Sequence, residues 1–200
     1  MAKLVWNILD LLKKYGEEQV TDFVSDFSCE KMVDGEIRNL NPDIEHFIKA
    51  NAVQFARQKK SVTYIVGDSE DGAILGYFTI AHKSVEISAD NLSKTALKKM
   101  SRYAEYNEQT NSYPVSGFLI AQFGKNYAVD EGKRISGKEL MALTQTELLE
   151  MQHRAGGGIE YLDCIDDKQL MAFYTAEGFQ EFGMRCSKDG ITYHQFMKFF

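Results

Sequence analysis

The sequence predicts an α/β fold with a mixed, mostly antiparallel central sheet of six to seven strands and helices on both faces. Between Val115 and Phe179, extended and helical patterns alternate as in a βαβα unit. On either side of that stretch, short runs rich in β-branched and aromatic residues are separated by turn sequences, which is typical of antiparallel strands. With 200 residues, 44% of them hydrophobic and 26% charged, the chain has the composition of an ordinary globular protein.

The first residues favour an amphipathic helix. Leu4, Ile8 and Leu11 lie on one helical face. Because Asn7 and Asp10 interrupt the apolar run, it does not fit a signal peptide. No stretch approaches the roughly 20 apolar residues of a membrane-spanning helix, so no membrane is expected as a partner. We therefore divide the chain into an N-terminal helical extension, residues 1–22, and a single domain, residues 23–200.

The N-terminal half of that domain is expected to contain strands around one helix. Phe23–Cys29 predicts a short first strand. A helix should follow from Asn41 to about Arg57, because Pro42 suits the first helical position after a capping asparagine. Three further strands are predicted at residues 62–66, 74–81 and 85–87.

Residues 92–106 predict a helix with one basic face. Its cations are Lys94, Lys98, Lys99 and Arg102. Such a face can contact an anionic partner, for example a coenzyme A phosphate or RNA. A solvated helix face explains the same charges and is favoured, since runs of charge are usually of that kind. The net charge of −6 argues against a general nucleic-acid-binding protein.

The βαβα unit is the best-defined part of the sequence. Val115–Gly124 is a nearly continuous apolar run, as expected for a strand buried on both faces. A helix over Ser136–Arg154 carries an apolar stripe and ends at three consecutive glycines, 156–158. The strand Ile159–Ile165 follows at once, so it should run parallel to the first through a right-handed crossover. The helix N-terminus near Gly137 would then suit a ligand with phosphates.

The C-terminal residues predict two antiparallel strands, at 182–186 and 193–200, joined at Lys188-Asp189-Gly190. Because the last strand ends in two phenylalanines, we expect it to be buried. It should lie beside the strand at 159–165 or form a contact between subunits. The second arrangement would make the protein a homodimer.

Cysteine and histidine usage argues against a disulfide framework or a metal site. The cysteines, Cys29, Cys164 and Cys186, form no C-x-x-C pair. The histidines also lack metal-ligand spacing; they are His46, His82, His153 and His194. We therefore expect no metal and a reducing cytoplasm.

The βαβα unit carries a family resemblance. The residues after its second strand read Phe173-Tyr174-x-x-x-Gly178-Phe179. With this motif, Phe118–Phe179 resembles the core of the GNAT-family N-acetyltransferases, and the resemblance extends over roughly residues 23–200. Two departures stand out. Asp167 replaces the usual Asn, and the phosphate-binding turn, usually Q/R-x-x-G-x-G/A, has Ile135 where a glycine is usual.

The same turn also fits part of a P-loop. Residues 132–138 match G-x-x-x-x-G-K, but Glu139 stands where a magnesium-binding Ser or Thr is needed. A P-loop also follows its strand directly, whereas polar residues 125–131 intervene here. This disfavours a nucleotide hydrolase, and an ordinary basic turn before a helix remains an alternative.

The resemblance implies acetyl-CoA as co-substrate, no metal, and Tyr174 as general acid for the departing thiolate. A phenol with a pKa of about 10 is protonated at neutral pH and suits that role. The main chain of Phe123, Gly124 and Lys125 is expected to face the pantetheine and acetyl carbonyl. The other cofactor-binding residues implied are Lys133, Arg134, Ile135, Ser136, Gly137, Lys138 and Asp167. No general base is assigned; the carboxylates considered are Glu86, Asp163 and Asp166, with His82 as a further candidate.

Three functions follow from this interpretation. The first is acetyl transfer to a primary amine of a small molecule or protein. The second is the toxin-like GNAT activity, acetylation of the amine of aminoacyl-tRNA, which the acidic net charge disfavours. The third is a non-catalytic acyl-CoA sensor on the same fold. The acceptor depends on loops that vary within a fold, so the sequence leaves it open.

Overall fold

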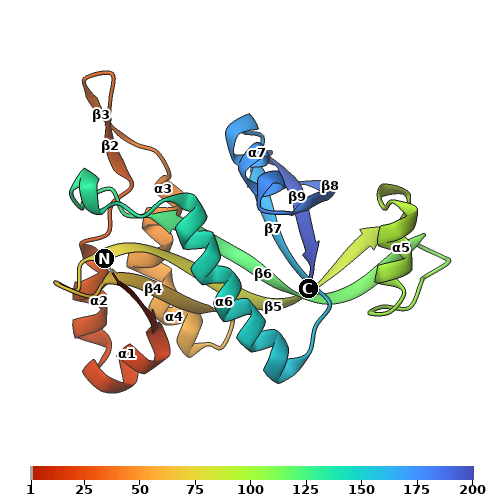
Figure 1. Ribbon diagram of the computed structural model, residues 1–200, viewed down its shortest axis with the longest axis horizontal. Coiled ribbons are helices and arrows are strands. Elements are labelled where there is room, and N and C mark those ends of the chain that lie inside the picture. Colours follow the sequence, from red (N-terminus) through yellow and green to blue (C-terminus); the bar gives the residue numbers. More distant parts are fainter. Residues whose placement is uncertain (1) are drawn as a thin grey trace. The chain divides into compact units, whose positions relative to one another are not determined.

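The computed structural model describes residues 2–200 and has a seven-stranded sheet in the order β1-β4-β5-β6-β7-β9-β8 (Figure 1). The strands are β1 (Lys3–Asn7), β4 (Val62–Asp68), β5 (Ile74–Ser88), β6 (Ser112–Lys125), β7 (Ile159–Ile165), β8 (Gln180–Cys186) and β9 (Thr192–Phe199). A separate hairpin pairs β2 (Glu30–Val33) with β3 (Glu36–Asn39). The predicted mixed, mostly antiparallel sheet is confirmed, and β6 and β7 form the expected parallel pair, with Phe118 opposite Glu160.

Seven α-helices accompany the strands: α1 (Ile8–Tyr15), α2 (Glu17–Ser25), α3 (Pro42–His46), α4 (Ala52–Arg57), α5 (Lys94–Met100), α6 (Gly137–Ala155) and α7 (Lys168–Ala176). A π-helical turn, Phe47–Asn51, joins α3 to α4, so the helix predicted from Asn41 to Arg57 is present with a widened middle turn. No helix within residues 2–200 has the length and apolarity needed to cross a membrane.

Contacts divide the chain into two compact units. Unit 1 is the chain up to Ala81 together with Ala121–Thr144, and unit 2 is His82–Ile120 together with Gln145–Phe200. Each unit has its own hydrophobic core, described separately below.

Unit 1 has helices on both faces of its strands. On one face α1, α2 and the helix at 42–57 pack on β4 and β5, burying Ile8, Val24 and Tyr77. The other face is covered at Gly76, the residue before Tyr77, because neighbouring residues of a strand are directed to opposite faces. A Cβ at Gly76 would lie 3.4 Å from a methyl carbon of Ile135 and of Leu140, so these two side chains pack over the glycine.

The core of unit 2 gathers side chains from α5, β6, β7 and β9. It includes Met100, Val115, Ile159 and Met197, with Ile87 from the end of β5. As predicted, β9 lies beside β7 and pairs on its other side with β8.

The expected N-terminal helix is wrong for the first residues. Lys3–Asn7 form the edge strand β1, antiparallel to β4, with Val5 opposite Val66. Gly67 makes room for this strand, because a Cβ there would lie 2.1 Å from the Trp6 ring. Asn7 ends the strand and caps α1, its side chain accepting from the Leu9 N–H at 2.9 Å. The proposed boundary between residues 22 and 23 stays a prediction.

One strand prediction is wrong, and a predicted break between two others is absent. Phe23–Cys29 is not a strand, because α2 continues to Ser25 with Val20 and Val24 buried one helical turn apart. The strands expected at 74–81 and 85–87 are parts of one 15-residue strand, β5.

Candidate active site

The turn before α6 is held together by its own cations. The Lys133 ammonium binds the Asp71 carboxylate at 2.5 Å, which lowers the pKa of Asp71. Arg134 donates from Nε to the Val129 carbonyl at 3.2 Å and from Nη2 to the Tyr127 carbonyl at 3.1 Å. Two of the cations expected at a phosphate therefore have partners within unit 1, and Arg134 fixes the loop that leads into the turn.

Ser136 and Glu139 form a capping box at the start of α6. The Glu139 N–H donates to Ser136 Oγ at 3.1 Å, and the Ser136 N–H donates to the Glu139 carboxylate at 3.0 Å. Lys3 binds the same carboxylate at 2.8 Å and, as the main cause, lowers the pKa of Glu139 to about 2. The N–H groups of Gly137 and Lys138 have no acceptor within the helix, because N–H groups of the first turn point along the helix axis beyond its N-terminus.

Ile135 and Gly124 both contribute to the core of unit 1. Ile135 is 2% exposed and packs over Gly76, so its side chain is directed away from the surface of the turn. Gly124 lies against α3, where a Cβ would come within 2.3 Å of Ile44 Cγ2. The glycine expected to admit a pantetheine chain thus makes room for Ile44 in this structure.

Lys125 and Phe123 flank Gly124 at the end of β6, both half-buried. Lys125 is one of three cations around the ring of Tyr127, a cluster that the sequence analysis missed. The distances to the ring centroid are 5.5 Å from Lys125 Nζ, 5.9 Å from Lys31 Nζ and 5.5 Å from Arg134 Cζ. Nothing in the residue spacing signals this cluster, because Lys31 comes from the distant β2 strand.

Tyr174 lies in an aromatic cluster of unit 2. Its ring makes edge contacts with Phe173 at 5.2 Å and Phe179 at 6.0 Å, and a tilted contact with Phe196 at 6.3 Å. The side chain is buried, and this burial, followed by the nearby Cys164 thiol, raises the pKa of the Tyr174 phenol. A phenol in this setting keeps its proton well above neutral pH.

Asp167 has a structural role at α7. Its Oδ1 accepts from the N–H groups of Gln169 at 2.8 Å and Leu170 at 3.0 Å. Asp and Asn both suit this capping position, which accounts for the Asp where the family pattern has Asn.

The carboxylates considered as general bases are engaged with other groups. Glu86 accepts from the Ser112 hydroxyl at 2.6 Å, which lowers the pKa of Glu86. Asp163 binds the Arg185 guanidinium at 2.8 Å. Asp166 lies 3.7 Å from His194. These contacts single out none of them as the base, and the ring of His82 packs edge-on against Phe118 at 5.4 Å.

Glu160 is a buried carboxylate that the sequence analysis did not single out. It is 1% exposed, accepts from Gln145 Nε2 at 2.6 Å and lies 3.6 Å from Lys198 Nζ. Burial raises the pKa of Glu160 despite these partners. Glu160 on β7 therefore forms an ion pair with Lys198 on β9 and a hydrogen bond with Gln145 on α6. Within residues 2–200 no group of three His, Cys, Asp or Glu side chains is placed to hold a metal ion.

Several solved structures share this fold. AtaT complexed with acetyl-methionyl-tRNAfMet matches at a TM-score of 0.63 and 14% identity, over 96% of this chain and 94% of that chain. A structure described as a bacterial toxin matches at 0.62 and 14%, over 99% and 90%. A Tyr-to-Phe mutant of KacT matches at 0.61 and 15%, over 97% and 94%.

No known family profile and no curated protein matches the sequence. At identities of 14–15%, the similarity of the structures establishes the fold. The chain therefore has the GNAT fold, which it shares with AtaT and KacT.

Proposed function

We propose that this chain is an acetyl-CoA-dependent N-acetyltransferase whose acceptor is the α-amine of an aminoacyl-tRNA. The observation that carries the proposal is the match to AtaT over nearly the full length of both chains, in a structure that holds acetyl-methionyl-tRNAfMet. A further AtaT structure, in the AtaTR assembly, is bound with acetyl-CoA and matches at a TM-score of 0.57 and 13% identity. These neighbours support the tRNA alternative better than a small or protein amine.

The residues at the start of α6 fit the pyrophosphate of the donor. The N–H groups of Gly137 and Lys138 are available, and the helix dipole favours an anion there. Ile135 does not obstruct the turn, because its side chain is buried beneath it. Lys138 is exposed and adds a positive charge beside these N–H groups.

Acetyl-CoA would supply the activated acetyl group. The acceptor nitrogen forms a bond to the acetyl carbon as the carbon–sulfur bond breaks, and the surplus proton of the amine leaves to solvent. We assign the proton that the departing sulfur needs to the Tyr174 hydroxyl. The assignment rests on the family motif around Tyr174; burial raises the pKa of this phenol, which keeps it protonated at neutral pH but makes it a weaker acid.

The test is acetylation of a panel of aminoacyl-tRNAs by the purified chain with radiolabelled acetyl-CoA. We expect label on aminoacyl-tRNA and none on deacylated tRNA, free amino acids or polyamines. Tyr174→Phe should lower kcat by about 10²-fold or more, the usual contribution of general acid catalysis, with little change in acetyl-CoA affinity by calorimetry.

Two other outcomes would replace the proposal. Label on free amines but not on aminoacyl-tRNA would establish the small-amine function. Binding of acetyl-CoA with an equally low rate of CoA release in wild type and Tyr174→Phe would establish the acyl-CoA sensor. Failure to bind acetyl-CoA at all would reject every function built on this donor.

A further inference from the structure

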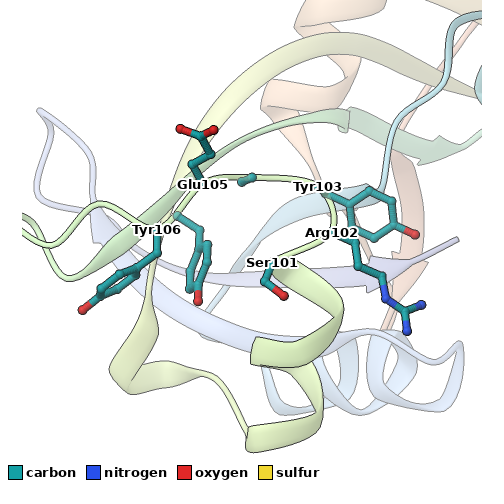
Figure 2. Close-up of a pocket in the computed structure, with 7 residues that line it drawn as sticks. Ser101, Arg102, Tyr103, Glu105 and Tyr106 are labelled. Atoms are coloured by element: carbon teal, nitrogen blue, oxygen red, sulfur yellow. The ribbon is translucent and has the colours of Figure 1, made fainter.

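Unit 2 has a surface hollow on the loop that follows α5. Its volume is about 420 Å³, and it is shallow and open to solvent. Figure 2 shows Tyr103 and Arg102 on one side of it and Tyr106 on the other. The remaining lining residues are Ser101, Ala104, Glu105 and Tyr113. We call this feature the tyrosine hollow.

Tyr103 is fixed on one side and exposed on the other. Tyr103 is 45% exposed, and its ring stacks on Phe199 with centroids 6.3 Å apart and planes 29° apart. It also rests on the backbone of Gly158, where a Cβ would lie 2.2 Å from the ring. These contacts hold an aromatic side chain at the surface without covering it.

Tyr106 is held in a comparable way. It is 47% exposed, and its hydroxyl donates to Asn111 Oδ1 at 2.8 Å. Its ring lies 5.3 Å from that of Tyr113, which is 8% exposed and also lines the hollow. Because both exposed rings are already positioned, a ligand that stacks on them would meet a small conformational-entropy cost.

The segment that leads into the hollow is positively charged. The segment 92–104 carries four cations, Lys94, Lys98, Lys99 and Arg102, and no carboxylate. In the part of the chain that the structure describes, no carboxylate pairs with any of the four. Lys99 Nζ lies 5.3 Å from the ring of Phe199, the ring on which Tyr103 stacks. The exposed aromatic faces therefore lie beside a segment with four cations, and Glu105, which lines the hollow, carries the opposite charge.

We infer that the tyrosine hollow binds an unpaired nucleobase of an RNA, with the basic segment 92–104 contacting the adjoining phosphates. Stacking of unpaired bases on tyrosine rings beside Lys and Arg is how proteins bind single-stranded RNA. A base inside a duplex is already stacked on its neighbours and would not be available to these rings. The choice of RNA as occupant rests on the proposed function, and the hollow would contact an unpaired stretch of the tRNA acceptor.

The binding test uses fluorescence anisotropy with a labelled single-stranded RNA and with the same strand annealed to its complement. Tyr103→Leu and Tyr106→Leu should each weaken single-strand binding by at least about fivefold, the lower end of what loss of one stacked base causes. Tyr106→Phe should keep the affinity, because it retains the ring. The duplex should bind more weakly than the single strand and be unaffected by the leucine variants.

Tyr15→Leu is the matched control. Tyr15 is 47% exposed and lies 4.7 Å from Lys14 Nζ, so it is also an exposed tyrosine beside a cation, but it lies in unit 1. Its substitution should leave RNA affinity unchanged. Equal losses in Tyr15→Leu and the hollow variants, or full affinity in a folded Tyr103→Leu/Tyr106→Leu double variant, would overturn the inference. Thermal melting verifies that the variants are folded.

Acetylation kinetics separate this inference from the proposed function. If it is correct, the hollow variants raise the KM for aminoacyl-tRNA while leaving the KM for acetyl-CoA unchanged. If the wild type acetylates aminoacyl-tRNA and the leucine variants change neither RNA affinity nor KM, the inference about the hollow is wrong and the proposed function is supported. Tyrosine-dependent RNA binding without acetylation would support the hollow and reject the acceptor assignment.

Discussion

Cys29 shows how burial of one residue makes the stability of the protein depend on pH. It is 1% exposed, and desolvation, followed by the charge of Glu45, raises the pKa of its thiol from 9.0 to about 12. Above about pH 9 the unfolded chain loses this proton while the folded chain keeps it. The free energy of unfolding should therefore fall between about pH 9 and pH 12, with a limiting slope of about 1.4 kcal/mol per pH unit.

Urea unfolding at about pH 8 and about pH 10.5 measures this effect. Cys29→Ala should make the stability less dependent on pH, because the titrating group is removed. Cys186→Ala serves as the control, since Cys186 is exposed. An identical pH dependence in wild type and Cys29→Ala would contradict the assignment.

Two glycines near the predicted donor site differ in what surrounds them. A Cβ at Gly124 would lie 2.3 Å from Ile44 Cγ2, whereas nothing lies within 4 Å of a Cβ at Gly132. Gly124→Ala should reduce the free energy of unfolding by about 1–3 kcal/mol, the usual cost of overpacking. Gly132→Ala should change it by less than about 1 kcal/mol.

Chemical denaturation of both variants checks this prediction. Ile44→Ala in the Gly124→Ala background should restore part of the loss, giving a coupling between the two sites. Additive effects of the two substitutions would show that the glycine is needed for another reason, such as approach of the donor. The same variants should then be compared for acetyl-CoA affinity.

At the scale of the element, the cap of α7 separates a structural role from a binding role. Asp167→Ala should cost about 1 kcal/mol of stability, because two N–H groups at the helix start lose their acceptor. Asp167→Asn should keep most of that stability, since an asparagine side chain also caps. Thermal and urea unfolding measure both variants.

The same pair tests whether Asp167 also contacts the donor. A fold-stable Asp167→Asn with unchanged acetyl-CoA affinity by calorimetry assigns the residue to capping alone. Reduced affinity at unchanged stability would support the cofactor-binding role implied by the family resemblance.

The elements predicted well are those whose signals are local. The strand at 159–165 and the helix over 137–155 follow from apolar spacing and from the glycines between them, and both are present. The strand Lys3–Asn7 was missed because its Leu4 has helical spacing to Ile8 and Leu11, which lie in α1. Its pairing with β4, and the room that Gly67 leaves for Trp6, decide the conformation through contacts across more than 50 residues.

For the candidate site, Tyr174 and the turn at 132–137 were proposed from the family motif, and the cations of segment 92–104 from their spacing; the roles of these residues stay predictions. The tyrosine hollow could not be predicted, because Tyr103 is positioned by Gly158 and Phe199, which come from the far end of unit 2 in sequence. The ring contacts of Tyr127 depend on Lys31 from another strand in the same way.

At the scale of the whole molecule, the net charge of −6 sets how RNA can be bound. A protein covered by positive charge would contact many phosphates, and its affinity would fall steeply with salt. Under the inference drawn above, the attraction comes from one segment with four cations. Neutralising up to four phosphates of a single strand predicts a slope of log K against log salt no steeper than about −3.

Anisotropy titrations of the labelled single-stranded RNA at several potassium chloride concentrations measure this slope. Arg102→Gln should make it shallower by about 0.7, the contribution of one phosphate contact on a single strand, whereas Lys13→Gln on α1 should leave it unchanged. A slope much steeper than −3, or equal effects of the two substitutions, would mean that phosphates are contacted over a wider surface than segment 92–104. A shallow slope that changes with Arg102→Gln but not with Lys13→Gln would instead fit a short unpaired stretch of RNA. A few charges would bind it, and stacking would orient it.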